Sequence, residues 1–470
     1  MRSIRQVLQS IRHDLDRLRT PGSFTRNSFH FLSGNALGML SQLLLTPIIA
    51  RIYGPEAYGM FGLYLALVMN SASVSDLGFS AAYVLPREEE KFLHLVRFNL
   101  LLTGVVSCCC LLIAICSGPL YRMFPDLAVL GNWIYLVAPV SAFYSLSIIA
   151  TQWLARAKKF KESAFTGVSM DAGTRLFNVA FGLWSKGMPY GLMLGDALVR
   201  GAALPFYARW LRPVGLDRLR TGWAWASIRG TVIEYRRYPL WIFPERWVSL
   251  LGIQLPLFFL ASDLAAVGHF ALGASLLLIP LRLLGFSFGP VYMQKAAETV
   301  HAAPEELKRV TRGLFTRLLW VGLGPFLLMT FFADHGFALI FGEPWRDAGF
   351  ATACLGPSFL FRLVTEPLVS IFNVRRKEHF MLVFQIVLNV LRTAAMGAML
   401  YLGLGTDAVL IAYGLGSLLG SMVLSAFVLD AARLNGTAMT VRATLLVLVA
   451  SALFAALRYA LFGSWVPLPG

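Results

Sequence analysis

The chain has 470 residues, of which 57% are hydrophobic and only 14% are charged, and its mean hydropathy is +0.66. A soluble domain carries about 25% charged residues, so this composition argues against an ordinary soluble protein and favours one that spans a membrane. The formal net charge of +16 does not indicate a nucleic-acid-binding protein, because the Lys and Arg residues lie in short loops between apolar runs, where they meet lipid headgroups.

The first 26 residues form a basic N-terminal segment. They lack the central apolar region of a signal peptide. Their apolar residues fall on one face of a helix and arginines cover the remainder. The apolar face comprises Ile4, Leu8, Ile11, Leu15 and Leu18. This pattern predicts either a helix on the membrane surface or a soluble helix packed on a cytoplasmic loop.

Thirteen apolar runs of about 20 residues follow, each long enough to cross a bilayer as a helix. The first six are predicted at 28–50, 57–79, 98–118, 131–152, 164–184 and 188–208, the next six at 239–261, 265–290, 313–333, 348–372, 380–402 and 407–429, and the last at 443–463. Five cysteines pack within these runs and have neither zinc-ligand nor disulfide spacing. They are Cys108, Cys109, Cys110, Cys116 and Cys354.

This pattern predicts an all-α, polytopic membrane protein with about 12–14 transmembrane helices in two six-helix lobes around a central cavity. The predicted parts are a cytoplasmic amphipathic segment 1–26, an N-lobe 27–208, a basic cytoplasmic linker 209–238, a C-lobe 239–430 and an extra C-terminal helix within 431–470. The loops on the N-terminal side of the membrane hold 29 Lys and Arg, and the opposite loops hold four. This bias predicts a cytoplasmic N-terminus.

An internal repeat relates the two sets of spans. The second span opens with Gly59-Met60-Phe61 and the eighth with Gly268-His269-Phe270, and each opening is followed further along by the tetrapeptide Leu-Gly-Phe-Ser. The two matches occur in the same order and at nearly the same offset. Repeats of six spans keep the same orientation, so they are related by an axis along the membrane normal, with a substrate site expected between them.

Several short segments resemble a known family of membrane proteins. Residues 43–61 and 75–79 resemble the opening of the Wzx-type flippases for polysaccharide and O-antigen repeat units, which belong to the multidrug/oligosaccharidyl-lipid/polysaccharide (MOP) exporter superfamily. Residues 266–272 are similar to the second-lobe counterpart of that segment, and residues 339–345 are similar to the short outer loop before the tenth span.

The resemblance implies two six-helix lobes, a cavity that opens to alternate sides of the membrane, and an oligosaccharide linked to undecaprenyl pyrophosphate as the substrate. The related lipid II flippases usually carry arginine in the first span. The first span of this chain offers only His30, Asn35 and Gln42 as polar side chains suited to a cavity. This departure makes lipid II a less favoured substrate.

Ionisable residues within the spans are the candidate functional residues, because they are energetically unfavourable there and usually face a cavity. The basic ones are all arginine, which binds phosphate oxygens in bidentate fashion: Arg175, Arg200, Arg246, Arg282, Arg317, Arg362, Arg392 and Arg458. The acidic ones, the candidates for ion coupling, are Asp76, Asp171, Asp196, Glu245 and Glu366.

Three oppositely charged pairs have i, i+4 spacing, namely Asp171 with Arg175, Asp196 with Arg200, and Arg362 with Glu366. Each pair has two possible roles. The two charges can simply neutralise one another and so lower the free energy of inserting the helix into the membrane. Alternatively, the carboxylate can take up H⁺ or Na⁺ and thereby free the arginine to bind substrate. The expected substrate-binding residues are Arg246, Arg282, Arg392 and Arg362. The alternative to substrate binding is that these arginines form ion pairs with Asp76 or Glu245 on other helices. Arg317 and Arg458 lie near span ends and are expected to snorkel.

The predicted function is transport of a polyprenyl-pyrophosphate-linked oligosaccharide from the cytoplasmic to the outer leaflet of the bacterial inner membrane. The alternatives are a cation-coupled drug antiporter of the same superfamily and a membrane enzyme of polysaccharide assembly. We expect no enzymatic activity, no cofactor and no metal; coupling to H⁺ or Na⁺ is compatible with the intramembrane carboxylates. The expected partners are the lipid-linked glycan, membrane lipids and other polysaccharide-assembly proteins, but no nucleic acid.

Overall fold

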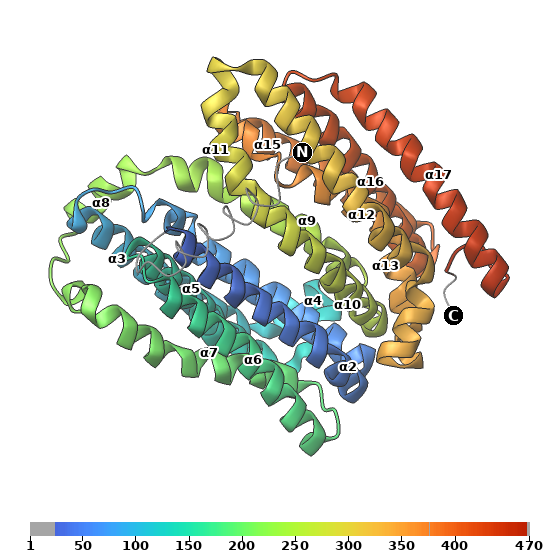
Figure 1. Cartoon of the computed structure of the whole chain (residues 1–470). Helices are drawn as coiled ribbons and strands as arrows, with labels where there is room; N and C mark the ends of the chain where they lie inside the picture. Colours follow the sequence, from blue (N-terminus) through green and yellow to red (C-terminus); the bar gives the residue numbers. More distant parts are fainter. Residues whose placement is uncertain (1–23, 376, 468–470) are drawn as a thin grey trace.

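The computed structural model describes residues 24–375 and 377–467, and all of the regular secondary structure in these ranges is helical (Figure 1). The predicted surface helix within 1–26 lies almost entirely outside the described residues. Helix α2 (Phe24–Asp76) contains the first two predicted spans and is broken at Gly54, which has φ 72° and ψ 173°. Glycine adopts this backbone conformation without steric strain, and Pro55 follows it, so the chain reverses here between two spans.

The remaining helices of the predicted N-lobe follow the expected order. The long ones are α3 (Glu89–Ile115), α5 (Val137–Arg156), α6 (Phe160–Ser185) and α7 (Tyr190–Leu211), and the short ones are η1 (Phe79–Ala82), α4 (Ser117–Met123) and η2 (Pro125–Leu136). Helix α2 packs against α3, α5 and α6, and α7 packs against α5 and α6. The segment between the lobes contains η3 (Arg212–Val214), η4 (Leu216–Arg220) and α8 (Trp225–Glu234), and α8 packs on α3.

The C-terminal half begins with η5 (Tyr238–Ile242), α9 (Phe243–Phe259), α10 (Leu264–Pro280), η6 (Leu281–Gly285) and α11 (Phe286–Ala302). It continues with α12 (Pro304–Phe341), η7 (Glu343–Trp345), α13 (Arg346–Thr365), α14 (Ser370–Val374), α15 (Glu378–Tyr401), α16 (Gly405–Ala431) and α17 (Gly436–Phe462). Helix α13 packs between α10, α12 and α16, whereas α17 lies at the edge of the bundle against α12 and α16 (Figure 1).

The described helices form a multi-pass membrane protein. Nine helical segments are long and apolar enough to cross a membrane. In each of α3, α15 and α17 only 17% of the most apolar stretch is buried in the protein. The exposed apolar surface of these helices requires lipid around it. Helices α6, α7 and α9 coincide with the fifth to seventh predicted spans but are not among the nine. Each of them carries charged residues, which lower its hydropathy.

Two predicted boundaries are wrong for identifiable reasons. The ninth span was expected to end at residue 333, with a loop from 334 to 347, but α12 continues to Phe341 because residues 334–341 remain mostly apolar. The eighth span is not one regular helix. It changes to a π-helix, η6, directly after Pro280, since proline lacks the backbone donor that an α-helix needs at that position.

The two halves meet through α2 and α10. A Cβ added to Gly59 would lie 1.9 Å from the carbonyl oxygen of Leu264, and one added to Gly268 would lie 1.9 Å from that of Pro55. Each glycine thus contacts the residue four positions before the other glycine. Such a reciprocal contact is typical of a two-fold relationship between interacting surfaces, and it agrees with the repeat predicted from the sequence.

Candidate substrate and ion sites

Arginines from both halves, one on α6 and one on η6, lie within electrostatic reach of one another. Arg282 lies in the π-helix η6 and is exposed, and Arg175 of α6 is close enough for the two charges to interact. Within the described part of the chain neither residue forms an ion pair, and the buried Nε of Arg175 has no hydrogen-bond partner. Asp171 is near enough to Arg175 to act on its charge, but the predicted i, i+4 ion pair between them does not form. Asp171 and Arg282 thus act on the charge of Arg175 in opposite directions, and we call the region of Arg175 and Arg282 between the lobes the basic boundary.

Arg246 is exposed in the first turn of α9, a helix that packs against α2 of the other half. Its charge acts on Asp76 of α2, yet the two side chains form no ion pair. Asp76 instead accepts hydrogen bonds from the backbone N–H of Ser80 at 3.1 Å, from the hydroxyl of Ser80 at 2.8 Å and from Asn99 Nδ2 at 3.1 Å. Arg246 therefore remains available to another anion, whereas Asp76 stabilises the end of its own helix.

The predicted pair on α7 forms. Arg200 Nε lies 2.8 Å from Asp196 Oδ1, and the guanidinium carbon lies 3.6 Å from the ring centre of Tyr144. The Tyr144 hydroxyl donates to the same carboxylate at 3.3 Å. Asp196 is only 3% exposed, and its Oδ2 has no hydrogen-bond partner. One carboxylate oxygen is thus left free to accept a proton or an ion.

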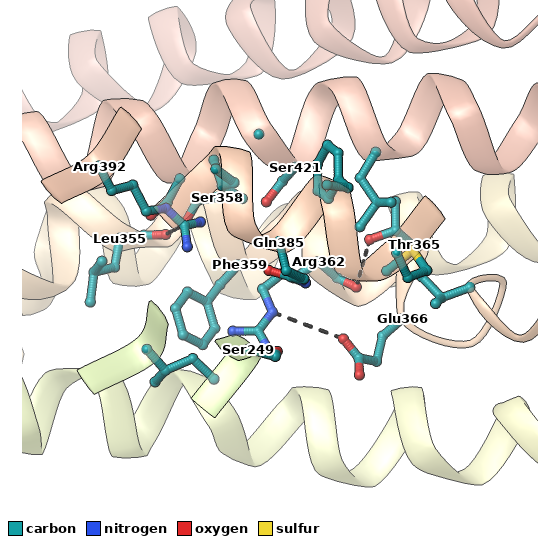
Figure 2. Close-up of a pocket in the computed structure, with 18 of the residues that line it drawn as sticks. Ser249, Leu355, Ser358, Phe359, Arg362, Thr365, Glu366, Gln385, Arg392 and Ser421 are labelled. Atoms are coloured by element: carbon teal, nitrogen blue, oxygen red, sulfur yellow. Dashed lines mark hydrogen bonds and ion pairs between the residues drawn. The ribbon is translucent and has the colours of Figure 1, made fainter. Parts of the chain in front are cut away.

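The other predicted site residues line a cavity inside the C-terminal half. This cavity, of about 120 Å³, lies between α9, α13, α15 and α16. Its lining residues with a formal charge are Glu245, Arg362, Glu366 and Arg392. The predicted Arg362–Glu366 pair is loose, with 3.9 Å between Nε and Oε2, as the dashed line in Figure 2 shows. Arg392 is 9% exposed and forms no ion pair with a described residue.

Arg458 does not snorkel, which corrects the expectation from its position near a span end. It is 2% exposed, and its Nη1 and Nη2 contact the two carboxylate oxygens of Asp334 at 2.7 and 2.6 Å. It also donates to the backbone carbonyl of Phe331. Asp334 was missed because the sequence placed it in a loop rather than in α12. Arg317 is exposed on the same helix.

Two side chains, Arg51 and Trp345, join the two halves near the C-terminal end of α12, and His269 contacts the same segment from within the C-terminal half. We call this group (Arg51, His269 and Trp345) the latch. Arg51 donates to the carbonyls of Ile340 and Leu339 at 3.0 and 2.9 Å, at the C-terminal end of α12. Trp345, only 1% exposed, donates to the carbonyl of Ala50 at 3.0 Å, and His269 Nε2 lies 2.8 Å from the carbonyl of Pro344. The sequence pattern did not identify this group, because its partners are backbone atoms.

Residues 24–293 match the model of a family described as polysaccharide biosynthesis protein. The chain belongs to this family. The match covers more than half of the chain and includes the segments 43–61 and 266–272 that carried the resemblance, so the predicted relationship is confirmed. No curated protein matches the sequence at a significant level.

The fold is that of the MOP superfamily. An inward-facing multidrug-resistance MATE transporter superposes with a TM-score of 0.67 at 14% identity, over 84% of this chain and 95% of that one. The lipid II flippase MurJ in an inward-closed conformation gives 0.62 at 14% identity, over 92% and 98%. A MOP-superfamily transporter from Pyrococcus furiosus gives 0.60 at 15% identity, over 87% and 96%. At 14–15% identity these similarities show the fold of this chain but do not identify its substrate.

Proposed function

We propose that the protein is a flippase that moves a polyprenyl-pyrophosphate-linked oligosaccharide from the cytoplasmic to the outer leaflet by alternating access. Membership of the polysaccharide biosynthesis family supports a glycan substrate, and the MOP fold supports transport between two lobes. The single observation that carries the proposal is that Arg175 and Arg282, from opposite lobes, are close enough for their charges to interact, while neither forms an ion pair with a described carboxylate; Asp171 also acts on the charge of Arg175.

Two guanidinium groups of like charge repel one another, and the repulsion grows as the surroundings become less polar. A group with two or more negative charges bound between them would replace the repulsion by attraction. Pyrophosphate has this charge, and guanidinium binds its oxygens through paired N–H donors. Arg246, exposed on α9 where this helix packs against α2, would add a third donor group. A neutral or cationic drug would not relieve the repulsion.

The latch fits the same proposal. The charge distribution of the loops predicts that the latch lies on the outer side and that Arg246 and Arg282 lie toward the cytoplasm, where the lipid-linked precursor is made. In this arrangement the latch closes the outer side while the arginines receive the pyrophosphate from the inner leaflet. Release outside would require the latch to open. Asp196, with one free carboxylate oxygen, is our candidate for taking up H⁺ or Na⁺ during this change.

The proposal is tested by substituting Arg282, which is exposed at the lobe boundary. Arg282→Gln keeps most of the side-chain volume and removes the charge, whereas Arg282→Lys keeps the charge and loses the paired donors. Hydrogen bonds to charged groups contribute about 1.5–3 kcal/mol, so we expect the Gln variant to bind substrate roughly tenfold to a hundredfold more weakly. The Lys variant should keep part of the activity.

Transport is measured as flipping of a purified lipid-linked oligosaccharide in proteoliposomes and as glycan export in cells that lack the native gene. Arg317→Gln is the matched control, because Arg317 is also an exposed arginine on a C-lobe helix but lies outside the basic boundary. Full flipping by Arg282→Gln at normal protein abundance would refute the proposal. Drug efflux without any glycolipid flipping by the wild type would favour the antiporter.

A further inference from the structure

We propose that the cavity inside the C-terminal half binds a small inorganic anion, of the size and charge of chloride, between Arg392 and Ser417. The cavity lies between α9, α13, α15 and α16 and is separate from the boundary at which Arg175 and Arg282 meet. The proposal concerns binding within one lobe, and it stands whether or not the protein transports a glycolipid.

Arg392 is the starting point, because its charge has no counterpart. The side chain is 9% exposed, its Nε has no hydrogen-bond partner, and within the described residues no carboxylate pairs with it. Its one close aromatic contact is the ring of Tyr413, 5.3 Å from the guanidinium carbon. The Tyr413 hydroxyl is already used, since it donates to the carbonyl of Gly252 at 2.9 Å. A cation–π contact offsets only part of the energy of burying a guanidinium, so a further negative partner is needed.

Ser417 supplies a second unused donor at the same place. Its hydroxyl is buried without a hydrogen-bond partner, the residue is 5% exposed, and it lines the cavity together with Arg392. The stem of Arg392 lies against α16 next to Ser417, since a Cβ added to Gly416 would lie 3.4 Å from Arg392 Cγ. Unpaired buried polar groups are rare in folded proteins and commonly mark an unseen water or ion. Two donors that face one cavity, one of them charged, favour an anion.

The distribution of charge around the cavity also favours binding of the anion at the end near Arg392 and Ser417. Arg362 acts electrostatically on Arg392, so the neighbourhood of Arg392 gains positive charge from it. Figure 2 shows Arg392 on one side of Arg362 and Glu366 on the other. Glu245 and Glu366 are close enough to influence one another, which places the acidic charge at the end away from Arg392. The cavity is therefore polarised, with its basic end at Arg392 and Ser417.

The size of the cavity selects the ligand. A volume of about 120 Å³ accommodates a small anion with a few water molecules, but not a pyrophosphate joined to a sugar and a polyprenyl chain. Water alone would satisfy the hydrogen bonds of Arg392 Nε and Ser417 Oγ but would leave the charge of Arg392 without a counterion. A monovalent inorganic anion satisfies both requirements.

The test uses the full-length protein in nanodiscs, prepared without halide and titrated with sodium bromide or with sodium gluconate at equal ionic strength. The thermal unfolding midpoint is followed by tryptophan fluorescence. We expect the midpoint of the wild type to rise saturably with bromide but not with gluconate. Arg392→Gln should abolish the bromide effect, Ser417→Ala should raise the half-saturating bromide concentration several-fold, and Arg317→Gln should respond as the wild type does.

Three outcomes would overturn the proposal. The first is equal responses of the wild type to bromide and gluconate, which would mean that water fills the cavity. The second is an unchanged bromide response in Ser417→Ala, a variant that is mild enough to fold even if Arg392→Gln is not. The third is competition by inorganic pyrophosphate with bromide at low concentration, which would assign Arg392 to the phosphate groups of a substrate. Anomalous scattering from bromide beside Arg392 in crystals would support the proposal directly.

Discussion

At the scale of single residues, burial separates the arginines more sharply than their position along the helices does. Arg458 and Arg392 are both almost completely buried, but Arg458 has a carboxylate partner and Arg392 has none among the described residues. Arg458 and Asp334 form a structural ion pair between α17 and α12. Removing one member of a buried pair leaves the other charge unpaired and destabilises a protein by about 3–5 kcal/mol.

We therefore expect Asp334→Asn to lower the thermal unfolding midpoint of the purified protein markedly and to weaken the attachment of α17. The double variant Asp334→Asn/Arg458→Gln should recover part of the loss, because neither charge then remains buried alone. Glu343→Gln is the control, since it breaks the exposed Glu343–Arg346 pair and should leave the midpoint unchanged. If Asp334→Asn and Glu343→Gln were equally stable, Arg458 would have to be stabilised by something other than Asp334.

At the scale of helices, the contact between α2 and α10 holds the two halves together beside the latch. Gly59 and Gly268 permit the two helices to approach until each backbone touches the other. A methyl group at Gly59 would lie 1.9 Å from a backbone oxygen, a distance that only movement of a helix can relieve. Substitution should thus favour the conformation in which this contact is open.

We expect Gly59→Ala to lengthen the distance between spin labels placed at Lys186 and Tyr401, on the latch side of the two lobes. The labels are attached to cysteines in a background from which the five native cysteines have been removed, and the distance is measured by pulsed electron paramagnetic resonance. Gly104→Ala is the control, because a Cβ there meets open space. An unchanged distance in Gly59→Ala would show that the contact does not hold the lobes closed.

At the scale of the whole molecule, the orientation in the membrane is predicted from the charges of the loops, without reference to the site. A reporter fused after Lys161 or Arg237 should read cytoplasmic, and one fused near Glu343 should read external. Helix α17 (Gly436–Phe462) is long and apolar enough to cross the membrane, so a fusion after residue 467 should also read external. Alkaline phosphatase and green fluorescent protein fusions give opposite signals on the two sides. A cytoplasmic signal near Glu343 would reverse the proposed direction of transport.

Much of the architecture was predictable from the sequence because its signals are local. A run of about 20 apolar residues must become a helix in a bilayer, since its backbone groups have no other partners there. The pair Asp196–Arg200 was also predictable from a local signal, because residues four positions apart lie on the same face of a helix. The internal repeat could be recognised in the sequence partly by Gly59 and Gly268. A larger residue at either position would force the two helices apart. Glycine and proline determined the break at Gly54 and the π-helix after Pro280.

Only the tertiary structure decided which charges are paired. Arg282, Arg392 and Arg458 all read from the sequence as intramembrane arginines without a local carboxylate. Packing gave Arg458 a partner on another helix, placed Arg282 opposite Arg175 and left Arg392 alone in a cavity. Contacts between helices depend on the rotation and depth of each helix relative to its neighbours. A one-residue step turns a side chain by about 100°, so apolar patterning that suffices to predict a span does not determine which side chains meet across it.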